Sequence, residues 1–529
     1  MKKFDFAIIG SGAAGAAIAS RLADKYPKKS IALIEQGKSD NASLLKIPIF
    51  TGLLLRGSRF TEQYESEPVP SLNNRKISLP RGKVLGGSTS INGMVYARGL
   101  AIDYEYWAQT GLSNWGWDDV KPYFLKTENF SQGKNKNHAI NGPWDVTLFE
   151  KPLLPICQAF LKAGNTLGFP FCNDLNKPDA YGFGFNQFSI SNGRRVSSTT
   201  SFLRGQKNIK IYLEHKVDRV LFKGIKACGI KLFNKNKTKD VLADKIIMSS
   251  GAIGTPMILI RSGIGDLRKL TELDIPCIYH SPLVGKNLQD HVLIRVSAYA
   301  KKSSDTLHNL NSFFGGFKAV SSAYLNRKGP ASRFPLEAAG YISFDNEKPA
   351  SVHLNFLPLL TTGNIRIGLR SQATNTNPGF MANGYLMRPR SRGYLELCKK
   401  NEKFISQIHP NYLSDPNDLD ELVQTTKVLV KMFRSEPFSQ YFEKFTEPIE
   451  SHLDNDEIED WVRQNADTVH HLCGTCKMGI QKDSVVDEKL KVRGVENLYI
   501  ADASVFPTIP SANISAPTVM VAERLADWL

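Results

Sequence analysis

The sequence predicts an α/β protein with a Rossmann-like first domain and a second domain of α+β type, in which helices cover a sheet. Three observations lead to this prediction. The chain starts with an apolar run, a glycine-rich turn and an alanine-rich segment, which is the order of a strand–turn–helix unit. Residues 292–467 show strand patterns followed by helix patterns. Strand and helix patterns then return between residues 498 and 529.

The first turn matches a dinucleotide-binding motif. Residues 6–9 are apolar and lead into G-x-G-x-x-G, whose glycines are Gly10, Gly12 and Gly15. The first glycine permits a tight turn, the second lets backbone approach a pyrophosphate, and the third brings the helix close to the strand. A second apolar run ends in Glu35, whose carboxylate can accept hydrogen bonds from an adenosine ribose. The residues predicted to contact the dinucleotide here are Gly10, Ser11, Gly12, Ala13, Ala14, Gly15, Glu35 and Gln36.

Length and charge limit the possible classes of function. With 529 residues the chain can bury a large core and is expected to divide into two domains. Lys and Arg number 67 against 51 Asp and Glu, which gives a net charge of +16, but the basic residues are spread along the chain. A solvated basic surface is therefore favoured over a specific polyanion partner, and no nucleic-acid partner is expected.

Cysteine usage and hydropathy bear on location. The seven cysteines are odd in number and scattered, which argues against a disulfide framework and for a reducing compartment. No segment has eighteen uninterrupted apolar residues, so a membrane-spanning helix is not expected. We therefore expect a cytoplasmic protein, and its basic surface is also compatible with peripheral contact to the inner face of an anionic membrane.

A long glycine-rich stretch, residues 81–99, follows an irregular region. It contains five glycines, several small hydroxyl side chains and Asn92. Such residues make poor core and poor regular helix, but they suit backbone that wraps closely around a ligand. An ordinary surface loop is the alternative, which the length and the uncharged middle of the stretch disfavour.

Three stretches together resemble the glucose–methanol–choline (GMC) family of flavin-dependent oxidoreductases. Residues 81–99 are similar to the first signature of this family, residues 251–265 to the second, and residues 282–291 to a further family segment. With both ends of the chain included, the resemblance covers nearly the whole sequence, and it implies FAD as the cofactor. Outside the first turn, it implies an FAD site lined by Arg81, Val84, Gly86, Gly87, Ser88, Asn92, Gly93, Met94, Val95, Val217, Ser250, Gly251, His470, Ala501, Asp502, Asn513, Ile514 and Thr518.

The resemblance also implies how the chain divides. Residues 1–291 are expected to form the FAD-binding domain, with excursions toward the other domain, and residues 292–465 to form the substrate-binding domain. Residues 466–529 then return to the FAD domain with the catalytic pair. In the second domain, strand patterns lie at 337–344, 352–356 and 393–397, and helix patterns at 418–434 and 455–463.

Residues 469–479 are the richest in reactive side chains. Two histidines beside Cys473 and Cys476 suggest zinc, but all candidate ligands lie within seven residues and no second cysteine pair exists, so no metal is expected. A thioredoxin-like redox pair lacks its usual surroundings. His471, in His-x-x-Gly-Thr, resembles the family's catalytic histidine. An imidazole with a pKa of about 6.5 can take a proton from an alcohol at neutral pH, whereas a structural histidine is the alternative.

Asn513 falls where the family carries its second catalytic residue, a His or an Asn. An amide there can hydrogen-bond the alcohol oxygen, and a capping role at a helix N-terminus is compatible with this. The final helix is expected over residues 519–529, with Ser515 as N-cap and its positive end toward the flavin. The implied mechanism is hydride abstraction, in which His471 takes the hydroxyl proton, Asn513 orients the oxygen and an aldehyde or ketone forms.

Within the family, the motifs are most similar to choline dehydrogenase-like members. Glu337 could balance a substrate ammonium or form a surface or interdomain salt bridge. Two positions that are often aromatic in the family carry Glu62 and His470, so the aromatic cage that would hold choline is incomplete. By chain position, His470 abuts the flavin or the substrate. Ile91 stands where some relatives have a flavin-linking histidine, which implies non-covalent FAD.

The function expected is oxidation of a small-molecule alcohol, choline-like or another primary alcohol, with oxygen or a quinone as electron acceptor. Two alternatives remain open. One is a flavoprotein of the same fold with photodecarboxylase-like or lyase-like chemistry, and the other is a non-catalytic flavin-binding protein. Both are disfavoured because His471 and Asn513 are both present.

Overall fold

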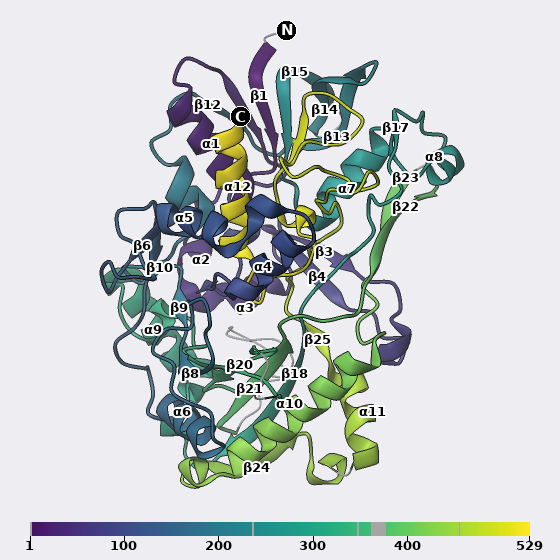
Figure 1. Cartoon of the computed structure of the whole chain (residues 1–529). Coiled ribbons are helices and arrows are strands. Elements are labelled where there is room, and N and C mark those ends of the chain that lie inside the picture. The colour runs from purple at the N-terminus through teal and green to yellow at the C-terminus, as the bar shows by residue number, and fades with distance from the viewer. Residues whose placement is uncertain (1–2, 235–236, 346–348, 361–376, 402, 454) are drawn as a thin grey trace.

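The computed structural model of the chain describes residues 3–529 apart from 235–236, 346–348, 361–376, 402 and 454. Two large sheets lie at opposite ends of the molecule, each with its own helices (Figure 1). The first sheet is largely parallel near its centre and the second is antiparallel. The predicted combination of an α/β domain and an α+β domain is therefore confirmed.

The first sheet has the strand order β12-β2-β1-β15-β14-β13, with β26 paired to β15. Strands β12, β2, β1, β15 and β26 are parallel, so their carboxyl ends meet at one edge of the sheet. The loops that carry most of the predicted cofactor residues leave from this edge. The strands are β1 (Lys3–Ile9), β2 (Ile31–Ile34), β12 (Ile209–Tyr212), β13 (Lys216–Lys223), β14 (Lys226–Asn234), β15 (Lys237–Met248) and β26 (Leu498–Ile500).

The first and last helices, α1 (Ala13–Lys25) and α12 (Ser515–Trp528), lie side by side against this sheet (Figure 1). The alanine-rich surface of α1 lets the two backbones approach closely. Arg21 Nε donates to the carboxylate of Glu523, at 2.7 Å, and this carboxylate is fully buried. Tyr26 donates through its hydroxyl to the Leu529 carbonyl oxygen at 3.2 Å. Segments about 500 residues apart therefore form one layer.

The start of α12 corrects one expectation. The helix begins at Ser515 rather than at residue 519, and Ile514 is its N-cap, without a side-chain cap. Pro517 lies in the first turn, where its missing N–H has no helical partner to lose, so the helix can begin before it.

The second sheet has the order β24-β18-β21-β20-β19-β8, with β25 paired to β18. One of its strands, β8, comes from the N-terminal half of the chain, and the predicted domain limits and excursions stay predictions. The strands are β8 (Gly182–Phe185), β18 (Val292–Ala300), β19 (Ala338–Ile342), β20 (Val352–Leu357), β21 (Gly379–Leu386), β24 (Phe442–Glu447) and β25 (Asp467–Thr468). The helices α6 (Ile156–Thr166), α10 (Pro416–Arg434) and α11 (Asn455–Asn465) pack against it.

The remaining elements lie outside the two large sheets. The remaining α-helices are α2 (Ser43–Lys46), α3 (Thr51–Leu55), α4 (Ala101–Gln109), α5 (Trp117–Thr127), α7 (Gly251–Arg261), α8 (Leu267–Glu272) and α9 (Phe313–Asn326). The remaining strands are β3 (Thr61–Glu65), β4 (Ser78–Gly82), β5 (Val95–Tyr96), β6 (Glu128–Phe130), β7 (Trp144–Val146), β9 (Gln187–Phe188), β10 (Ile190–Ser191), β11 (Arg194–Arg195), β16 (Ile264–Gly265), β17 (Tyr279–His280), β22 (Tyr394–Lys400) and β23 (Lys403–His409).

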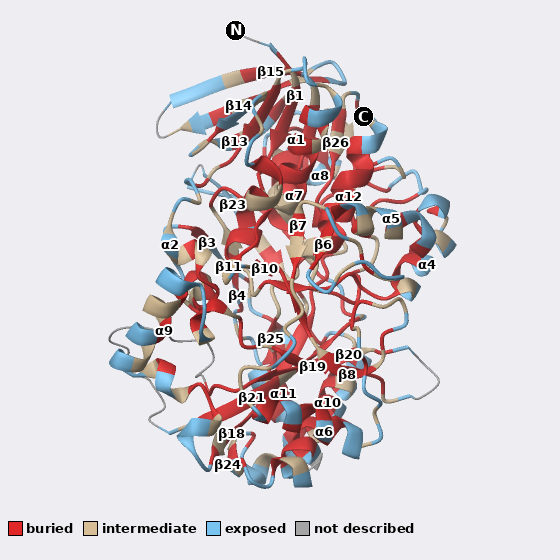
Figure 2. Ribbon diagram, turned by 90° about the vertical axis from the view of Figure 1, so that its left-hand side faces the viewer, coloured by how far each residue is buried: buried red, intermediate tan, exposed pale blue. Residues whose placement is uncertain are grey.

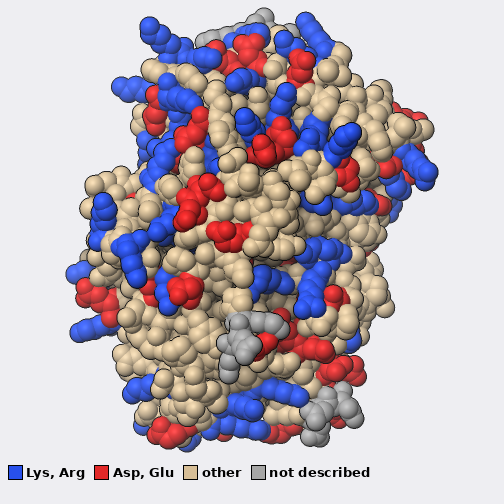
Figure 3. Space-filling model, viewed as in Figure 1, with Lys and Arg blue, Asp and Glu red and all other residues tan. Residues whose placement is uncertain are grey.

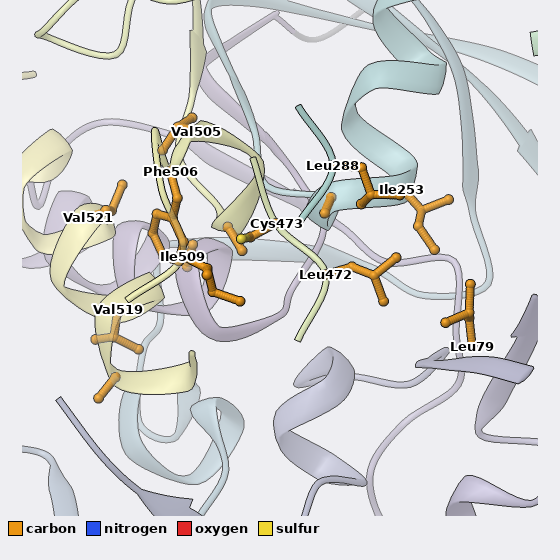
Figure 4. Close-up of a cluster of buried hydrophobic side chains, with 14 of the residues drawn as sticks. Leu79, Ile253, Leu288, Leu472, Cys473, Val505, Phe506, Ile509, Val519 and Val521 are labelled. Atoms are coloured by element: carbon orange, nitrogen blue, oxygen red, sulfur yellow. The ribbon is translucent and has the colours of Figure 1, made fainter. Parts of the chain in front are cut away.

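Burial follows these layers. Figure 2 shows buried residues running through the middle of both sheets and the region between them, with exposed residues at the margins. Behind the C-terminal motif, Leu472 and Cys473 pack with Leu288, Phe506 and Ile509 in an apolar cluster (Figure 4). Because these residues come from three separate loops, the cluster fixes the motif against the FAD domain.

All seven cysteines are free thiols. Lys and Arg side chains are spread over the face seen in Figure 3 rather than gathered in one patch. Within the part of the chain that is described, no helix is both long and apolar enough to span a bilayer.

Candidate active site

The turn after β1 has the backbone geometry that the dinucleotide motif predicts. Gly10 has φ +98°, and a Cβ there would lie 2.3 Å from the Ser249 carbonyl oxygen. A Cβ on Gly15 would lie 1.9 Å from the Gly10 carbonyl oxygen. A Cβ on Gly12, by contrast, would meet no protein atom within 4 Å. The turn is thus closed on the protein side and open at Gly12, where α1 begins without a side-chain cap.

Glu35 ties this turn to the end of β2. One carboxylate oxygen accepts hydrogen bonds from the Ser11 hydroxyl at 2.7 Å and the Ser11 N–H at 3.2 Å, and the other accepts from the Gly37 N–H at 2.8 Å. Burial raises the pKa of this carboxyl group. The contact of Glu35 with a ribose and the contact of Gln36 with the dinucleotide both stay predictions.

The glycine-rich loop packs directly onto the first turn. The Gly86 N–H donates to the Ser11 hydroxyl at 3.1 Å, and a Cβ on Gly87 would lie 2.8 Å from the Gly12 Cα. Asn92 accepts through its side-chain oxygen from the buried guanidinium of Arg195 at 2.8 Å. Residues 81–99 are therefore built into the protein rather than being an ordinary surface loop. The predicted residues Val84, Met94 and Val95 are buried here, Ser88 is exposed and Gly93 is half-buried.

The loops after β15 and β26 are joined by Asp502. Its carboxylate accepts from the Gly251 N–H at 2.8 Å, the Thr255 hydroxyl at 2.6 Å and the Ser504 N–H at 2.8 Å. A Cβ on Gly251, which has φ +75°, would meet nothing within 4 Å. The Asp502 carboxylate thus positions a second open glycine turn, and burial raises its pKa.

The remaining predicted cofactor residues flank these turns, and their contacts with FAD stay predictions. Ser250 is the N-cap of α7, and the Ala501 N–H donates to the Met248 carbonyl oxygen at 2.9 Å. Thr518 donates to the Ile514 carbonyl oxygen at 2.6 Å in the first turn of α12. Val217 is buried on β13.

His471 lies between Asn513 and a second histidine, His291. Its Nε2 atom is 3.2 Å from the Asn513 amide nitrogen, and its Nδ1 atom is 2.9 Å from His291 Nδ1. His291 Nε2 is 3.1 Å from the Met387 carbonyl oxygen, which can only accept, so this nitrogen carries the hydrogen. Burial lowers the pKa of His291 to about 3, so the ring is neutral and its Nδ1 accepts.

The tautomer of His471 follows from these contacts. Because His291 Nδ1 accepts, His471 Nδ1 carries the hydrogen, and the lone pair of His471 is on Nε2, facing Asn513. Burial, followed by the neighbouring His291, lowers the pKa of His471 well below its ordinary value of about 6.5. A neutral imidazole with a lone pair toward the amide can accept a proton there.

Asp290 holds the backbone of the segment that carries His471. Its carboxylate accepts from the His471 N–H at 2.6 Å, the Tyr412 hydroxyl at 2.6 Å and the Thr468 hydroxyl. The group is buried, and burial raises its pKa. Arg81 donates through its guanidinium to the His470 carbonyl oxygen at 2.6 Å, which fastens the glycine-rich loop to the same motif.

His470 has left-handed backbone, with φ +66°, and its Nδ1 atom is buried without a hydrogen-bond partner. Burial, followed by the charge of Arg81, lowers the pKa of its imidazole to about 4. Asn513 Oδ1 is likewise buried without a partner. Both atoms can accept or share a hydrogen bond with a bound group.

The second sheet contributes aromatic and imidazole rings beside His291. Tyr385 stacks on His291 with ring centroids 4.9 Å apart and lies opposite His353 in the β20–β21 register. The Tyr385 hydroxyl bonds His353 Nδ1, and Tyr341 packs on His353 at 4.6 Å. The sequence analysis did not single out His291 or Asp290 as site residues, and it also missed the rings of Tyr385, His353 and Tyr341. The signal was present in residues 352–356, where alternation places a polar His on a buried face.

Two carboxylates that the sequence analysis singled out already have protein partners. Glu337 accepts from the Leu153 N–H at 2.6 Å and from Arg333 at 3.1 Å. Glu62 pairs with Lys83. The Glu337 salt bridge is therefore a local one, to a residue four positions earlier in the chain, with the carboxylate buried. A role for Glu337 in holding a substrate cation stays a prediction.

The arrangement fits a flavin dinucleotide. Gly12 and Gly251 are open at the carboxyl edge of the sheet, as a bound pyrophosphate requires, and the N-terminus of α1 offers oriented N–H groups. Beside His471, the buried atoms His470 Nδ1 and Asn513 Oδ1 have no hydrogen-bond partner in the protein and can contact a bound group. In the described residues, no cluster of three or more His, Cys, Asp or Glu side chains is arranged to hold a metal ion.

Comparison with known proteins identifies the family of the chain. Family profiles described as GMC oxidoreductase match residues 4–293 and 389–522. The oxygen-dependent choline dehydrogenase of Chromohalobacter salexigens is 33% identical, covering 99% of this chain and 94% of that protein. The protein of the same name from Escherichia coli K12 is 33% identical, covering 100% of this chain and 95% of its own length.

Solved structures give the same result. Pyridoxine 4-oxidase from Mesorbium loti superposes with a TM-score of 0.88 at 26% identity, and 99% of each chain is covered. A formate oxidase variant from Aspergillus oryzae RIB40 superposes with a TM-score of 0.91 at 25% identity, covering 99% of this chain and 98% of that one.

Proposed function

This chain belongs to the GMC oxidoreductase family and is an FAD-dependent oxidoreductase, and we propose that it oxidises the CH–OH group of a small primary alcohol to an aldehyde. Bound FAD would accept the hydride from the alcohol carbon. The observation that carries the proposal is the 3.2 Å contact between His471 Nε2 and the Asn513 amide nitrogen in a buried site.

His471 takes the hydroxyl proton in this proposal. Its lowered pKa keeps the ring neutral, and therefore able to accept a proton, at neutral pH. A weakly basic imidazole is sufficient because the hydroxyl becomes strongly acidic as hydride leaves the adjoining carbon. The proton therefore moves with, or after, the loss of hydride, and the His291 contact holds the accepting nitrogen in place.

Asn513 orients the alcohol oxygen. An oxygen placed between the amide and His471 would replace their hydrogen bond, receive the Asn513 N–H and give its own proton to His471. The unpartnered Asn513 Oδ1 leaves the other end of the amide available to a bound group. His470, with its own unpartnered nitrogen, would contact the cofactor or the substrate from the neighbouring position.

The substrate is proposed to be a primary alcohol, with choline as one candidate. The relatives named oxygen-dependent choline dehydrogenase support choline. The pairing of Glu337 with Arg333 and of Glu62 with Lys83 supports an uncharged alcohol instead, because neither carboxylate is left to balance an ammonium. Non-covalent FAD and oxygen or a quinone as acceptor complete the proposal.

The test is anaerobic reduction of the purified holoenzyme. Addition of the right alcohol from a panel that includes choline should bleach the flavin absorbance, and His471→Ala should slow bleaching by about 10²- to 10⁴-fold while FAD is retained. His308→Ala, whose side chain lies outside the site, serves as the matched control. Reoxidation by oxygen or by a soluble quinone then identifies the acceptor.

Failure of every alcohol to bleach the flavin, with FAD fully bound, would contradict the proposal. That result would favour the alternative of different chemistry on the same fold, or of a non-catalytic flavin-binding protein. Normal bleaching in His471→Ala would remove His471 from the reaction and leave only the family assignment.

A further inference from the structure

The helix α9 presents large apolar side chains to solvent. It begins at Phe313, capped by the Ser312 hydroxyl, which accepts from the Gly315 N–H at 3.0 Å. Phe314 is 83% exposed, and Phe313 and Phe317 are 62% and 68% exposed. Figure 2 shows α9 at the margin of the molecule, away from the central strands of both sheets. We call the exposed set Phe313, Phe314, Phe317, Tyr324 and Leu325 the aromatic face of α9.

The helix packs on the protein through small residues instead. Ala319 and Ala323 are buried, and a Cβ on Gly315 would lie 2.0 Å from the Asn309 carbonyl oxygen. These residues share one side of the helix, whereas Phe313, Phe317 and Tyr324 share another. A helix on a soluble surface usually turns its large apolar residues inward. The reversed order in α9 indicates a partner for the outer side.

The charges around the aromatic face are of one sign. Between residues 306 and 336 the chain has Lys318, Arg327, Lys328 and Arg333 but no Asp or Glu. At the C-terminal end of α9, Arg194 donates to the carbonyl oxygens of Ala323 at 2.6 Å and Tyr324 at 2.7 Å. We call the set Lys46, Arg194, Lys318, Arg327 and Lys328 the basic border.

A cavity lies between the aromatic face and the basic border. Its volume is about 350 Å³, and it lies where the basic border meets the end of the aromatic face. Three of its lining residues are cationic and none is acidic. The lining residues are Ser43, Lys46, Ile47, Arg194, Tyr324, Leu325 and Arg327. Such a cavity suits an anionic headgroup whose apolar part continues along the helix.

We propose that α9 docks the enzyme on an anionic phospholipid bilayer, with its aromatic face in the headgroup–acyl boundary and the basic border against lipid phosphates. An amphipathic helix with large apolar residues on one side and basic residues beside them binds membranes in this way. A second copy of this chain fits less well, because a symmetric contact would bring the two basic borders together. An anionic surface instead complements them.

The test is sedimentation of the holoenzyme with large vesicles. The protein should sediment with vesicles of phosphatidylcholine mixed with phosphatidylglycerol and not with phosphatidylcholine alone, and binding should weaken as salt is raised. Phe313→Ser combined with Phe314→Ser and Phe317→Ser should lower vesicle affinity at least about tenfold. FAD content and flavin bleaching by the substrate should not change. The matched control is Phe171→Ser with Ile225→Ser and Ile480→Ser, three exposed apolar residues elsewhere.

A charge variant tests the second part of the proposal. Arg327→Gln with Lys328→Gln should reduce binding to phosphatidylglycerol vesicles severalfold, whereas Lys223→Gln with Lys226→Gln, on the β13–β14 hairpin, should not. Absence of binding by the wild type, or equal binding by the triple serine variant, would overturn the proposal. If the wild type is a dimer that does not bind vesicles, and the triple serine variant is a monomer, the aromatic face is a contact between two copies and the membrane proposal is wrong.

Discussion

The Nδ1 atom of His471 lies 2.9 Å from the Nδ1 atom of His291. Two nitrogens at this distance share one hydrogen, and the Met387 carbonyl decides which ring supplies it, because it occupies the other nitrogen of His291 as an acceptor. The contact therefore sets His471 Nε2 as the basic atom. A residue that directly precedes β18 in the second sheet thus fixes which nitrogen of His471 carries the hydrogen.

His291→Phe is expected to slow anaerobic flavin reduction by about hundredfold or more, because His471 loses the acceptor that fixes its tautomer. His291→Asn should retain most of the rate, since the Asn side-chain oxygen can take the place of Nδ1 and accept. Rapid-mixing absorbance at equal FAD content measures both. Equal rates in the two variants would show that the contact is structural only.

The acid limb of kcat/KM should lie below about pH 6.5, the ordinary pKa of imidazole, because the pKa of His471 is lowered and the neutral ring is the active form. Asn513→Asp should move this limb to higher pH, since a carboxylate 3.2 Å from Nε2 stabilises the imidazolium. Asn513→Ala lowers the rate without that shift and serves as the comparison. An unmoved limb in Asn513→Asp would mean that another group limits the rate in acid.

The folded protein should lose stability as the pH falls. Burial lowers the pKa of His291 and of His353 to about 3, whereas both titrate at about 6.5 once unfolded. Between these values the unfolded chain binds more protons, so the contribution of both rings is complete above pH 6.5 and declines below it. The Tm of the holoenzyme should fall with pH less steeply in His353→Gln than in the wild type.

Gly12→Ala is expected to fold normally but to bind FAD at least about tenfold more weakly, or ~1.4 kcal/mol. The added Cβ meets no protein atom within 4 Å, so its only obstacle would be the pyrophosphate. Gly10→Ala should instead impair folding, because its Cβ would lie 2.3 Å from the Ser249 carbonyl oxygen and its φ is +98°. Titration of apoprotein with FAD, beside thermal unfolding, separates the two effects. Unchanged affinity in Gly12→Ala would place the pyrophosphate elsewhere.

The fold, the glycine turn at residues 10–15 and the motifs of His471 and Asn513 could be predicted from the sequence, because short sequence patterns specify each of them. A turn between strand and helix needs glycines at fixed spacing, so Gly10 and Gly15 identify it without knowledge of the rest. His471 and Asn513 lie in distinctive motifs close together in the chain, and the structure places their side chains 3.2 Å apart.

The supporting contacts could not be predicted in the same way. Asp290, Tyr412 and Tyr385 come from segments far from residue 471 in the chain, and no local pattern specifies that these segments meet. The start of α12 was misplaced by one turn: Ser515, predicted as the N-cap, is the first helical residue, and the predicted first residue 519 lies inside the helix.

The side-by-side packing of α1 and α12 has a consequence for synthesis. The turn at Gly10 leaves the ribosome about 500 residues before Asn513, so over that stretch of synthesis the nascent chain holds only half of the predicted site. Until α12 has emerged, the surface of α1 that α12 covers has no packing partner, and Arg21 on that surface lacks the Glu523 carboxylate. Shielding of that exposed stretch by a chaperone, or early cofactor capture, would then decide how much newly made polypeptide reaches the native state.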